Sequence, residues 1–180
     1  MKYFSRMWKI ITELSESLLL GILFFMILNI SLQNYQVVGD SMVPNFTQDD
    51  RLILMKFSYI RKFDSNEFVK PFNPKRGDII VFKYPLNPER RFIKRIIAVA
   101  GDEIAINEGK VFLNGKQVKE LYLERDKYKD LTDFEPITIK YGHVFVLGDN
   151  RWVSNDSRNW GQLSNEFIIG EPWFKYWPLK

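Results

Sequence analysis

A single long apolar segment near the N-terminus is the strongest constraint on how this chain folds. It is densest over residues 18–32, which is shorter than the ~20 residues that a helix needs to cross the hydrocarbon core of a bilayer. Extending it back to Ile10 gives sufficient length and brings Glu13 and Glu16 to the inner interface. The sequence therefore predicts one transmembrane helix over residues 10–32.

The charges around this segment predict its orientation. Lys2, Arg6 and Lys9 precede it, and positively charged flanks stay in the cytoplasm. We therefore expect residues 1–9 to be cytoplasmic and residues 33–180 to lie outside the cell membrane. The alternative is a cleavable signal peptide, but no small-x-small cleavage pattern follows the apolar core, so the sequence favours an uncleaved anchor.

The composition beyond the anchor indicates one β-rich domain. Roughly 145 residues remain, enough for a single hydrophobic core. Aromatic residues make up 16% of the chain, and short runs of Val, Ile, Phe and Tyr favour strands. The absence of cysteine excludes disulfides, thiolate zinc sites and cysteine nucleophiles. The formal charge of +4 comes from interspersed acidic and basic residues, so we expect contact with anionic membrane lipid and no binding of nucleic acid.

Short strands separated by turns recur along residues 33–180, with no helical pattern among them. We therefore expect a mainly β fold, an antiparallel β-sheet domain behind one N-terminal transmembrane helix. Asn114-Gly115 predicts a tight hairpin. Residues 61–76 and 120–135 are polar, and we expect a loop and an exposed excursion there. The predicted strands cover residues 35–38, 51–57, 76–85, 91–99, 103–107, 110–113, 138–141, 143–147, 167–169 and 173–177.

A Val-Gly-Asp-Ser-Met-Val-Pro stretch at residues 38–44 follows the anchor closely. On its own, Gly-Asp-Ser is ordinary turn chemistry. Its serine, Ser41, lies nine residues beyond Leu32, so even a fully extended chain keeps it within ~30 Å of the bilayer. Any reaction at Ser41 therefore takes place close to the membrane surface.

A serine nucleophile needs a base, and the sequence offers a lysine for this task. The single histidine, His143, lies inside an apolar strand and is interpreted as structural. Lys94 would share one strand face with Phe92 and Ile96, and burial there lowers a lysine pKa below its usual ~10.4. A strand lysine that reaches solvent is the alternative. Three arginines of the same stretch are expected to add positive charge nearby: Arg90, Arg91 and Arg95.

Four short boxes follow one another along the chain. They are S-M-x-P from Ser41, R-G-D-I-I-V-F from Arg76, R-F-I-K-R around Lys94 with G-D after it, and G-D-N-R followed by S-x-D-S-R from Gly148. In order and spacing the chain resembles the bacterial type I signal peptidases, in the compact form of the Gram-positive branch. The resemblance implies a membrane-bound Ser/Lys endopeptidase that removes signal peptides from secreted preproteins. It also implies cleavage after small residues (Ala-x-Ala type), an acyl-enzyme and no cofactor or metal.

The resemblance assigns roles to the matching positions. Ser41 matches the nucleophile, and Lys94 matches its general base. In the last box, Ser154 matches a hydroxyl that orients the lysine, while Asp156 and Arg158 match a structural ion pair that holds the box beside the site.

Two positions depart from the family pattern. Gly39 stands where Gram-negative members carry an oxyanion-binding serine, so the oxyanion hole would rest on backbone N–H groups such as that of Ser41. Trp152 replaces the aspartate that usually follows G-D-N-R, the box that also contains Asp149.

The family's substrate lies extended beside the strands near the nucleophile and the lysine. Five residues are candidate pocket walls there, with core packing as the alternative: Tyr35, Val37, Met42, Phe92 and Ile93.

Two other hypotheses share these boxes. A related Ser/Lys processing peptidase would cut only a narrow set of substrates. A catalytically idle, membrane-tethered module would bind peptides in the same groove without cutting them.

Overall fold

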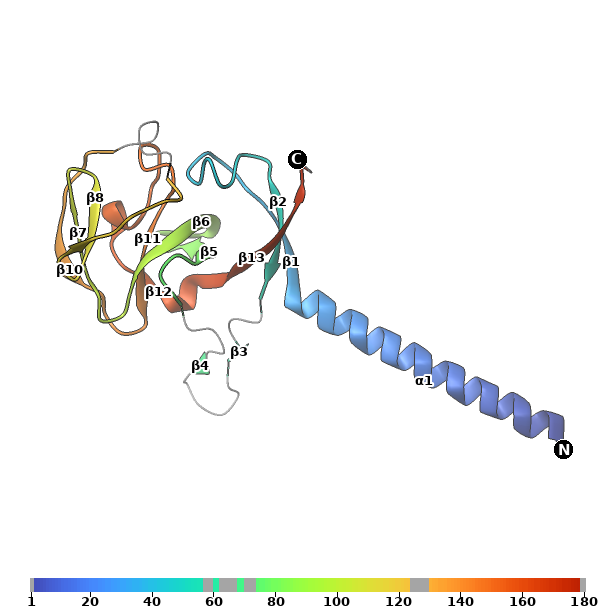
Figure 1. Cartoon of the computed structure of the whole chain (residues 1–180). Coiled ribbons are helices and arrows are strands. Elements are labelled where there is room, and N and C mark those ends of the chain that lie inside the picture. The colour runs from blue at the N-terminus through green and yellow to red at the C-terminus, as the bar shows by residue number, and fades with distance from the viewer. Residues whose placement is uncertain (1, 57–59, 62–67, 70–73, 124–129, 179–180) are drawn as a thin grey trace.

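A long N-terminal helix projects from a domain of antiparallel sheets (Figure 1). The structure is a computed structural model that describes residues 2–56, 60–61, 68–69, 74–123 and 130–178. The helices are α1 (Lys2–Ser31) and α2 (Ser157–Trp160), with the 3₁₀ turn η1 (Asn165–Phe167). The strands are β1 (Leu32–Gln36), β2 (Arg51–Met55), β3 (Ile60–Arg61), β4 (Phe68–Val69), β5 (Ile79–Tyr84), β6 (Asn87–Val99), β7 (Glu103–Asn107), β8 (Lys110–Leu113), β9 (Lys116–Gln117), β10 (Phe134–Thr138), β11 (His143–Leu147), β12 (Leu163–Ser164) and β13 (Ile168–Trp177). The predicted fold class is confirmed.

The helix α1 contains the predicted apolar segment. Its stretch Arg6–Ser31 has a mean hydropathy of 1.9, and none of the most apolar window is buried against the domain. Length and composition therefore allow it to cross a membrane. The helix begins before the predicted start at residue 10 and ends at Ser31, whose carbonyl accepts a hydrogen bond from Lys56 N at 2.8 Å. The chain then passes directly into β1.

A seven-stranded sheet in the order β1-β2-β13-β5-β6-β11-β12 forms the body of the domain. Its third strand in this order, β13, pairs with β2 on one side and with β5 on the other. The sequence predicted two strands here, residues 167–169 and 173–177. The structure has one strand, and Pro172 is accommodated at a register shift between Pro172 and Phe174, where a ladder hydrogen bond is not needed.

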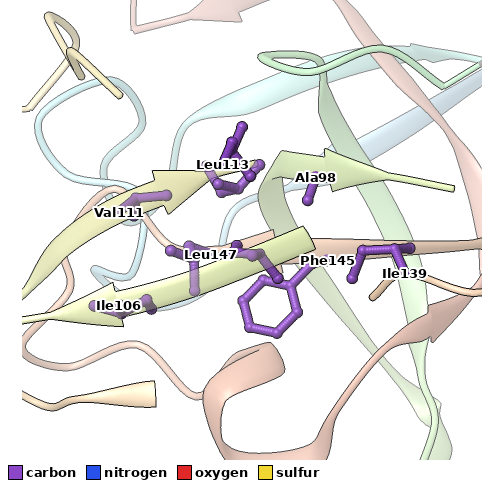
Figure 2. Close-up of a cluster of buried hydrophobic side chains, with 9 residues drawn as sticks. Ala98, Ile106, Val111, Leu113, Ile139, Phe145 and Leu147 are labelled. Carbon is purple, nitrogen blue, oxygen red and sulfur yellow. The ribbon is translucent and has the colours of Figure 1, made fainter. Parts of the chain in front are cut away.

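A four-stranded sheet in the order β10-β7-β8-β9 packs against the larger one. The predicted hairpin is present, since Asn114 and Gly115 have φ values of 51° and 76°, as a type I′ turn requires. Figure 2 shows the core between the sheets, where side chains of β6 and β11 meet those of the smaller sheet. Its buried members are Ile97, Ala98, Ile104, Ile106, Val111, Leu113, Ile139, Phe145 and Leu147.

A second buried cluster lies beneath the loop that joins β1 to β2, the loop that carries Ser41. It packs side chains of β1–β2 and this loop against β5 and β6. Burial of each large aliphatic side chain contributes ~1.5–3 kcal/mol, so this cluster anchors the loop firmly. Its members are Val37, Met42, Leu52, Leu54, Val81 and Ile93.

Several sequence predictions differ from the structure. The excursion 120–135 is not simply exposed, because Glu120 is buried and β10 begins at Phe134. The edge strand predicted at 138–141 is β10, which ends at Thr138, and the next residue, Ile139, is buried in the core. Residues 124–129 lie outside the described part.

Short elements account for the remaining differences. The predicted strand 51–57 ends at Met55, and residue 57 is not described. The predicted loop 61–76 contains the two-residue strand β4, and residues 62–67 and 70–73 are not described. The helix α2 was not predicted. Its N-terminus is capped by Asp156, whose side chain accepts from Arg158 N.

Asp102 ties the two sheets together at the turn after β6. Its buried carboxylate accepts hydrogen bonds from Arg76 Nε at 2.8 Å, Val99 N at 3.0 Å and Asn114 Nδ2 at 3.2 Å. Burial alone raises the pKa of this carboxyl, but the hydrogen bonds from Arg76, Val99 and Asn114 outweigh it and lower the pKa below its ordinary value.

We expect Asp102→Asn to destabilise the domain by about 2 kcal/mol at neutral pH, because a hydrogen-bonded charged group is lost. A lowered carboxyl pKa contributes stability that is present at neutral pH and lost as the pH falls through the folded pKa. The difference between wild type and variant should therefore shrink in strong acid. Thermal unfolding of the detergent-solubilised chain measures it, with the exposed neighbour Glu103→Gln as control. Equal effects of the two substitutions would contradict the prediction.

Candidate active site

Ser41 and Lys94 meet from two different parts of the seven-stranded sheet. Ser41 lies in the loop between β1 and β2, and Lys94 lies in β6. Lys94 Nζ is 2.6 Å from Ser41 Oγ and donates a hydrogen bond to Ile93 O at 3.0 Å. At such a distance a neutral amine can accept the hydroxyl hydrogen of a serine. The structure thus brings together the two residues that the sequence predicted as a pair.

Burial keeps the pKa of Lys94 low. The residue is 3% exposed, and its Nζ lies 5.2 Å from the centroid of the Phe92 ring. Burial lowers the pKa of Lys94 to about 8, whereas the carboxylates of Asp156 and Asp149 raise it and Arg158 lowers it further. A sizeable fraction of the side chain is therefore neutral near physiological pH.

The arginines of β6 do not supply the positive charge that the sequence analysis expected. Arg95 is paired with Asp149, which neutralises it. Arg90 and Arg91 are exposed, so water and salt screen them. The cation that acts on Lys94 is instead Arg158, from the last box.

The turn around Ser41 depends on Gly39. Its φ of +86° lies in the region that favours glycine, and no atom lies within 4 Å of where a Cβ would stand. Gly39 is therefore required by the backbone conformation and leaves open space beside the turn. In the described part of the chain, the backbone N–H of Ser41 donates no hydrogen bond.

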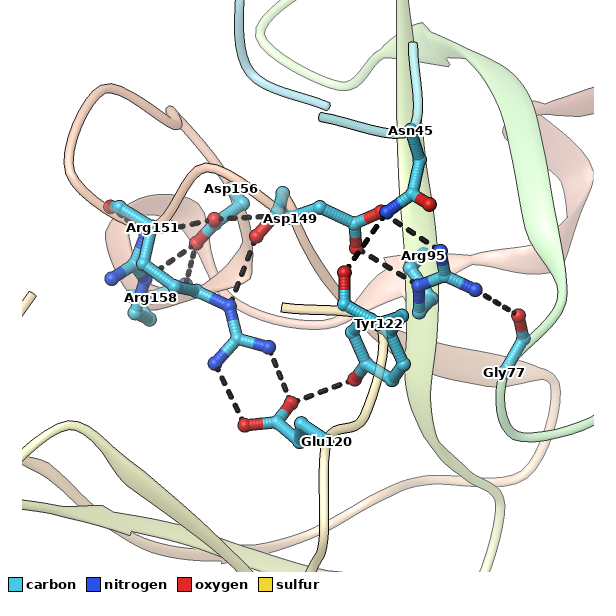
Figure 3. A network of polar contacts seen from close by, with 10 residues as sticks. Asn45, Gly77, Arg95, Glu120, Tyr122, Asp149, Arg151, Asp156 and Arg158 are labelled. Carbon is cyan, nitrogen blue, oxygen red and sulfur yellow. Dashed lines mark hydrogen bonds and ion pairs between the residues drawn. The ribbon is translucent and has the colours of Figure 1, made fainter. Parts of the chain in front are cut away.

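The last box forms a buried network of ion pairs beside the site (Figure 3). The predicted Asp156–Arg158 pair is present, with Arg158 Nε donating to Asp156 Oδ1 at 2.8 Å. Asp149 accepts from Arg95 Nε at 2.9 Å and Arg95 Nη2 at 2.8 Å. Arg151 pairs with the buried Glu120. The box is thus fixed both to β6 and to the segment that begins at residue 120.

Ser154 lies close to Ser41, and its hydroxyl makes no hydrogen bond to Lys94. The residue is 8% exposed, and its Oγ has no hydrogen-bond partner among the residues described. It contacts Gly148, as does the carbonyl oxygen of Ser41. A buried hydroxyl with no partner is uncommon, and its position beside the site makes it a candidate for a bond that forms during a reaction.

Gly148 is a functional residue that the sequence analysis missed. A Cβ on it would lie 2.5 Å from Ser41 O and closer still to Ser154 Oγ. Its N–H donates to Asp156 Oδ2 at 3.0 Å, and its carbonyl accepts from Arg151 Nε at 2.9 Å. The signal available in the sequence was a glycine directly after the apolar strand at 143–147, where close backbone contact excludes a side chain.

Four of the five candidate pocket residues lie in one buried cluster, and Phe92 lies outside it. Tyr35, Val37, Met42 and Ile93 belong to the cluster beneath the Ser41 loop. Phe92 points to the other side of β6, where its ring stacks on Tyr84 at 4.6 Å, because neighbouring residues of a strand face opposite ways.

His143 takes no part in this site. It lies in β11, and its Nδ1 is 3.1 Å from the carbonyl oxygen of Tyr141. Within the described ranges, no group of three or more His, Cys, Asp or Glu side chains could hold a metal ion.

We expect Gly148→Ala to lower activity by about 100-fold, because the added methyl group displaces the Ser41 backbone and misplaced reacting groups carry a penalty of this order. Gly170→Ala is the matched control, since a Cβ there would strike Met55 O away from the Ser41–Lys94 pair. Both variants should lose thermal stability, and only Gly148→Ala should lose activity per folded molecule. Similar activity losses in both would contradict the role of Gly148.

Comparisons with known proteins identify the family. The model of the family described as signal peptidase, peptidase S26, matches residues 11–177. Signal peptidase I of Bacillus caldolyticus is 39% identical over 162 residues, which cover 82% of this chain and 80% of that protein. Signal peptidase I S of Bacillus subtilis is 33% identical over 182 residues, covering 95% and 91%.

Two further matches differ in extent. The thylakoidal processing peptidase 1 of Arabidopsis thaliana is 37% identical over 79% of this chain, and the match spans 41% of that longer protein. The crystal structure of a signal peptidase I from Enterococcus faecalis is 31% identical, with a TM-score of 0.50 over 56% of this chain and 97% of that one. Since the family model covers nearly the whole chain, the chain belongs to the signal peptidase family, peptidase S26.

Proposed function

We propose that this protein is a membrane-bound signal peptidase I that removes signal peptides from secreted preproteins, cutting after small residues of the Ala-x-Ala type. The observation that carries the proposal is the 2.6 Å contact between Lys94 Nζ and Ser41 Oγ. Membership of the family and the names of its relatives support it.

The reaction follows from this contact. Neutral Lys94 takes the hydroxyl proton of Ser41 while Oγ attacks the scissile carbonyl carbon. The resulting oxyanion is bound by backbone N–H groups, with that of Ser41 as first candidate. Lys94 returns its proton to the leaving amine as the C–N bond breaks, which leaves an acyl-enzyme. Water, deprotonated by Lys94, then attacks the ester, releases the signal peptide as a carboxylate and restores Ser41.

Ser154 completes the hydrogen bonding of the protonated lysine. An ammonium group has three N–H donors, and Lys94 Nζ has two partners, Ser41 Oγ and Ile93 O. The unpartnered Oγ of Ser154 is the acceptor we assign to the third hydrogen once Lys94 has taken the proton. Ser154 would thus stabilise the charged form of the base.

The pockets for the substrate would lie over the cluster beneath the Ser41 loop. Tyr35, Val37, Met42 and Ile93 fill that cluster, so a pocket above them is shallow and suits alanine. Phe92 would bound the groove from the side of Lys94.

The helix and the C-terminal strand favour a place at the membrane. We place residues 1–9 in the cytoplasm, residues 10–32 across the bilayer and residues 33–180 on the outer face as the catalytic domain, following the positive charges before the apolar segment. Aromatic residues favour the lipid–water interface, and β13 exposes Trp173, Phe174 and Trp177. Phe174 pairs in register with Ile53, which pairs with Asn34 just beyond α1. Contact of β13 with lipid would hold the site at the membrane surface.

We expect Ser41→Ala and Lys94→Ala each to abolish cleavage of a preprotein. In the wild type, activity should fall as the pH drops below the Lys94 pKa of about 8, because the protonated amine cannot act as a base. Initial rates across pH in detergent or vesicles measure both effects. Full activity in either variant, or a rate unchanged in acid, would refute the mechanism.

A panel of diverse secretory precursors would expose a narrow processing peptidase, which should cut few of them.

We expect Ser154→Ala to lower the cleavage rate by about 10- to 100-fold, because the substitution removes one hydrogen bond to a charged group. Removing an acceptor of the ammonium should also move the acid limb of the pH profile to lower pH. Ser164→Ala, in the short edge strand β12, is the control. A variant with the wild-type rate and pH profile would show that Ser154 only fills space.

A further inference from the structure

The loop that carries Ser41 is attached to the last box at two points, and Figure 3 shows one of them, the bond from Asn45 to Asp149. Asn150 N donates to Ser41 O at 3.0 Å. Four residues after Ser41, Asn45 Nδ2 donates to Asp149 Oδ2 at 2.8 Å and to Tyr122 O at 3.1 Å. Both partners of this amide nitrogen are oxygen acceptors outside the loop. The position therefore uses both N–H donors of an amide group.

The same carboxylate also holds the strand that carries the lysine. Arg95 follows Lys94 in β6 and donates twice to Asp149, at 2.9 and 2.8 Å. Asp149 is 1% exposed and therefore accepts three N–H groups in a buried place. The guanidinium of Arg95 lies 4.0 Å from the ring centroid of Tyr122. Tyr122 therefore contacts both Arg95 and Asn45, the two residues that donate to Asp149.

We propose that Asn45 is a positioning residue for the Ser41–Lys94 pair, because it holds the nucleophile loop on the carboxylate that also holds the lysine strand. This inference rests on the roles proposed above for Ser41 and Lys94. Without the amide, the connection through Asp149 is broken on the side of the loop. The bond from Asn150 N to the Ser41 carbonyl is then the only hydrogen bond left between the loop and the last box among the residues described. The distance between Oγ and Nζ is then less well defined.

Asn45 also acts on the charge that Lys94 experiences. Burial lowers the pKa of Lys94, Asp156 and Asp149 raise it, and Arg158 lowers it. Hydrogen-bond donors stabilise the negative charge of Asp149 and reduce its attraction for the lysine proton. Loss of the Asn45 amide should therefore increase the protonated fraction of Lys94 at a given pH, as well as loosening the loop.

The substitution Asn45→Asp tests both effects. It keeps the size of the side chain, removes the donor and adds a second carboxylate beside Asp149. Because Asn45 is exposed, the change opens no cavity and the domain should fold. Asn107→Asp, at an exposed position of β7, is the control with the same change of charge.

We expect Asn45→Asp to reduce kcat/KM for a preprotein by about tenfold, and the deficit relative to wild type to grow as the pH falls. Asn45→Ala should show a smaller change in the same direction. The rate at which a serine-acylating inhibitor labels Ser41 across pH gives a second readout that needs no substrate, and the acid limb of this rate should also move to higher pH.

The outcomes separate this inference from the proposed function. Activity retained in Lys94→Ala would overturn the proposed function itself. If Lys94→Ala is inactive while Asn45→Asp matches Asn107→Asp at every pH, the function stands and the positioning role is overturned. A loss by the same factor at every pH, with an unchanged labelling profile, would overturn it as well, because a purely structural defect does not move the acid limb.

Discussion

The burial of Lys94 is the constraint on which the rest of the site depends. A lysine in water is almost entirely protonated at neutral pH, and only the packed environment of β6 lowers its pKa to about 8. Such a shift from the ordinary value corresponds to roughly 3 kcal/mol. A lowered lysine pKa destabilises the folded state. This cost is complete at pH values below the pKa of the folded state and disappears at pH values above the pKa of the unfolded state. The remainder of the domain has to offset this cost. Apolar packing on both faces of β6 buries the lysine, since Ile93 belongs to the cluster beneath the Ser41 loop, while Phe92 and Ile96 pack in another cluster on the face that carries Lys94.

Paired charges limit how far the nearby carboxylates raise the pKa of Lys94. Asp149 and Asp156 both raise the pKa of Lys94, and uncompensated carboxylates so close to an amine would keep it protonated. Each is instead held by an arginine, Asp149 by Arg95 and Asp156 by Arg158. Both ion pairs are buried, so their geometry is well defined. They hold the last box in place and also reduce the effect of the two carboxylates on Lys94.

Much of the fold and the central pair could be predicted, for physical reasons that differ between elements. The strands at 103–107, 110–113 and 143–147 have local patterns and clear turn signals, and the structure has them at these bounds. Ser41 and Lys94 could be paired because the order of the boxes is specific. Glu120 and Asn45 could not be placed, since a polar residue in a polar stretch resembles any solvated one. Their partners, Arg151 and Asp149, are distant in sequence, and only the tertiary fold makes them neighbours.

The position of β13 has a consequence for how the molecule is assembled. Ser41 belongs to the β1–β2 side of the large sheet and Lys94 to the β5–β6 side, and the strand between these sides is the last one in chain order. The pairings that join them link β13 to strands far earlier in the sequence, such as Phe174 to Ile53 and Ile168 to Phe82. Such pairings form slowly because a long loop must close first. The serine side and the lysine side of the sheet are therefore joined only after this final strand is in place. The sheet that holds Ser41 and Lys94 in place therefore depends on a C-terminal strand that lies far beyond both residues in the sequence.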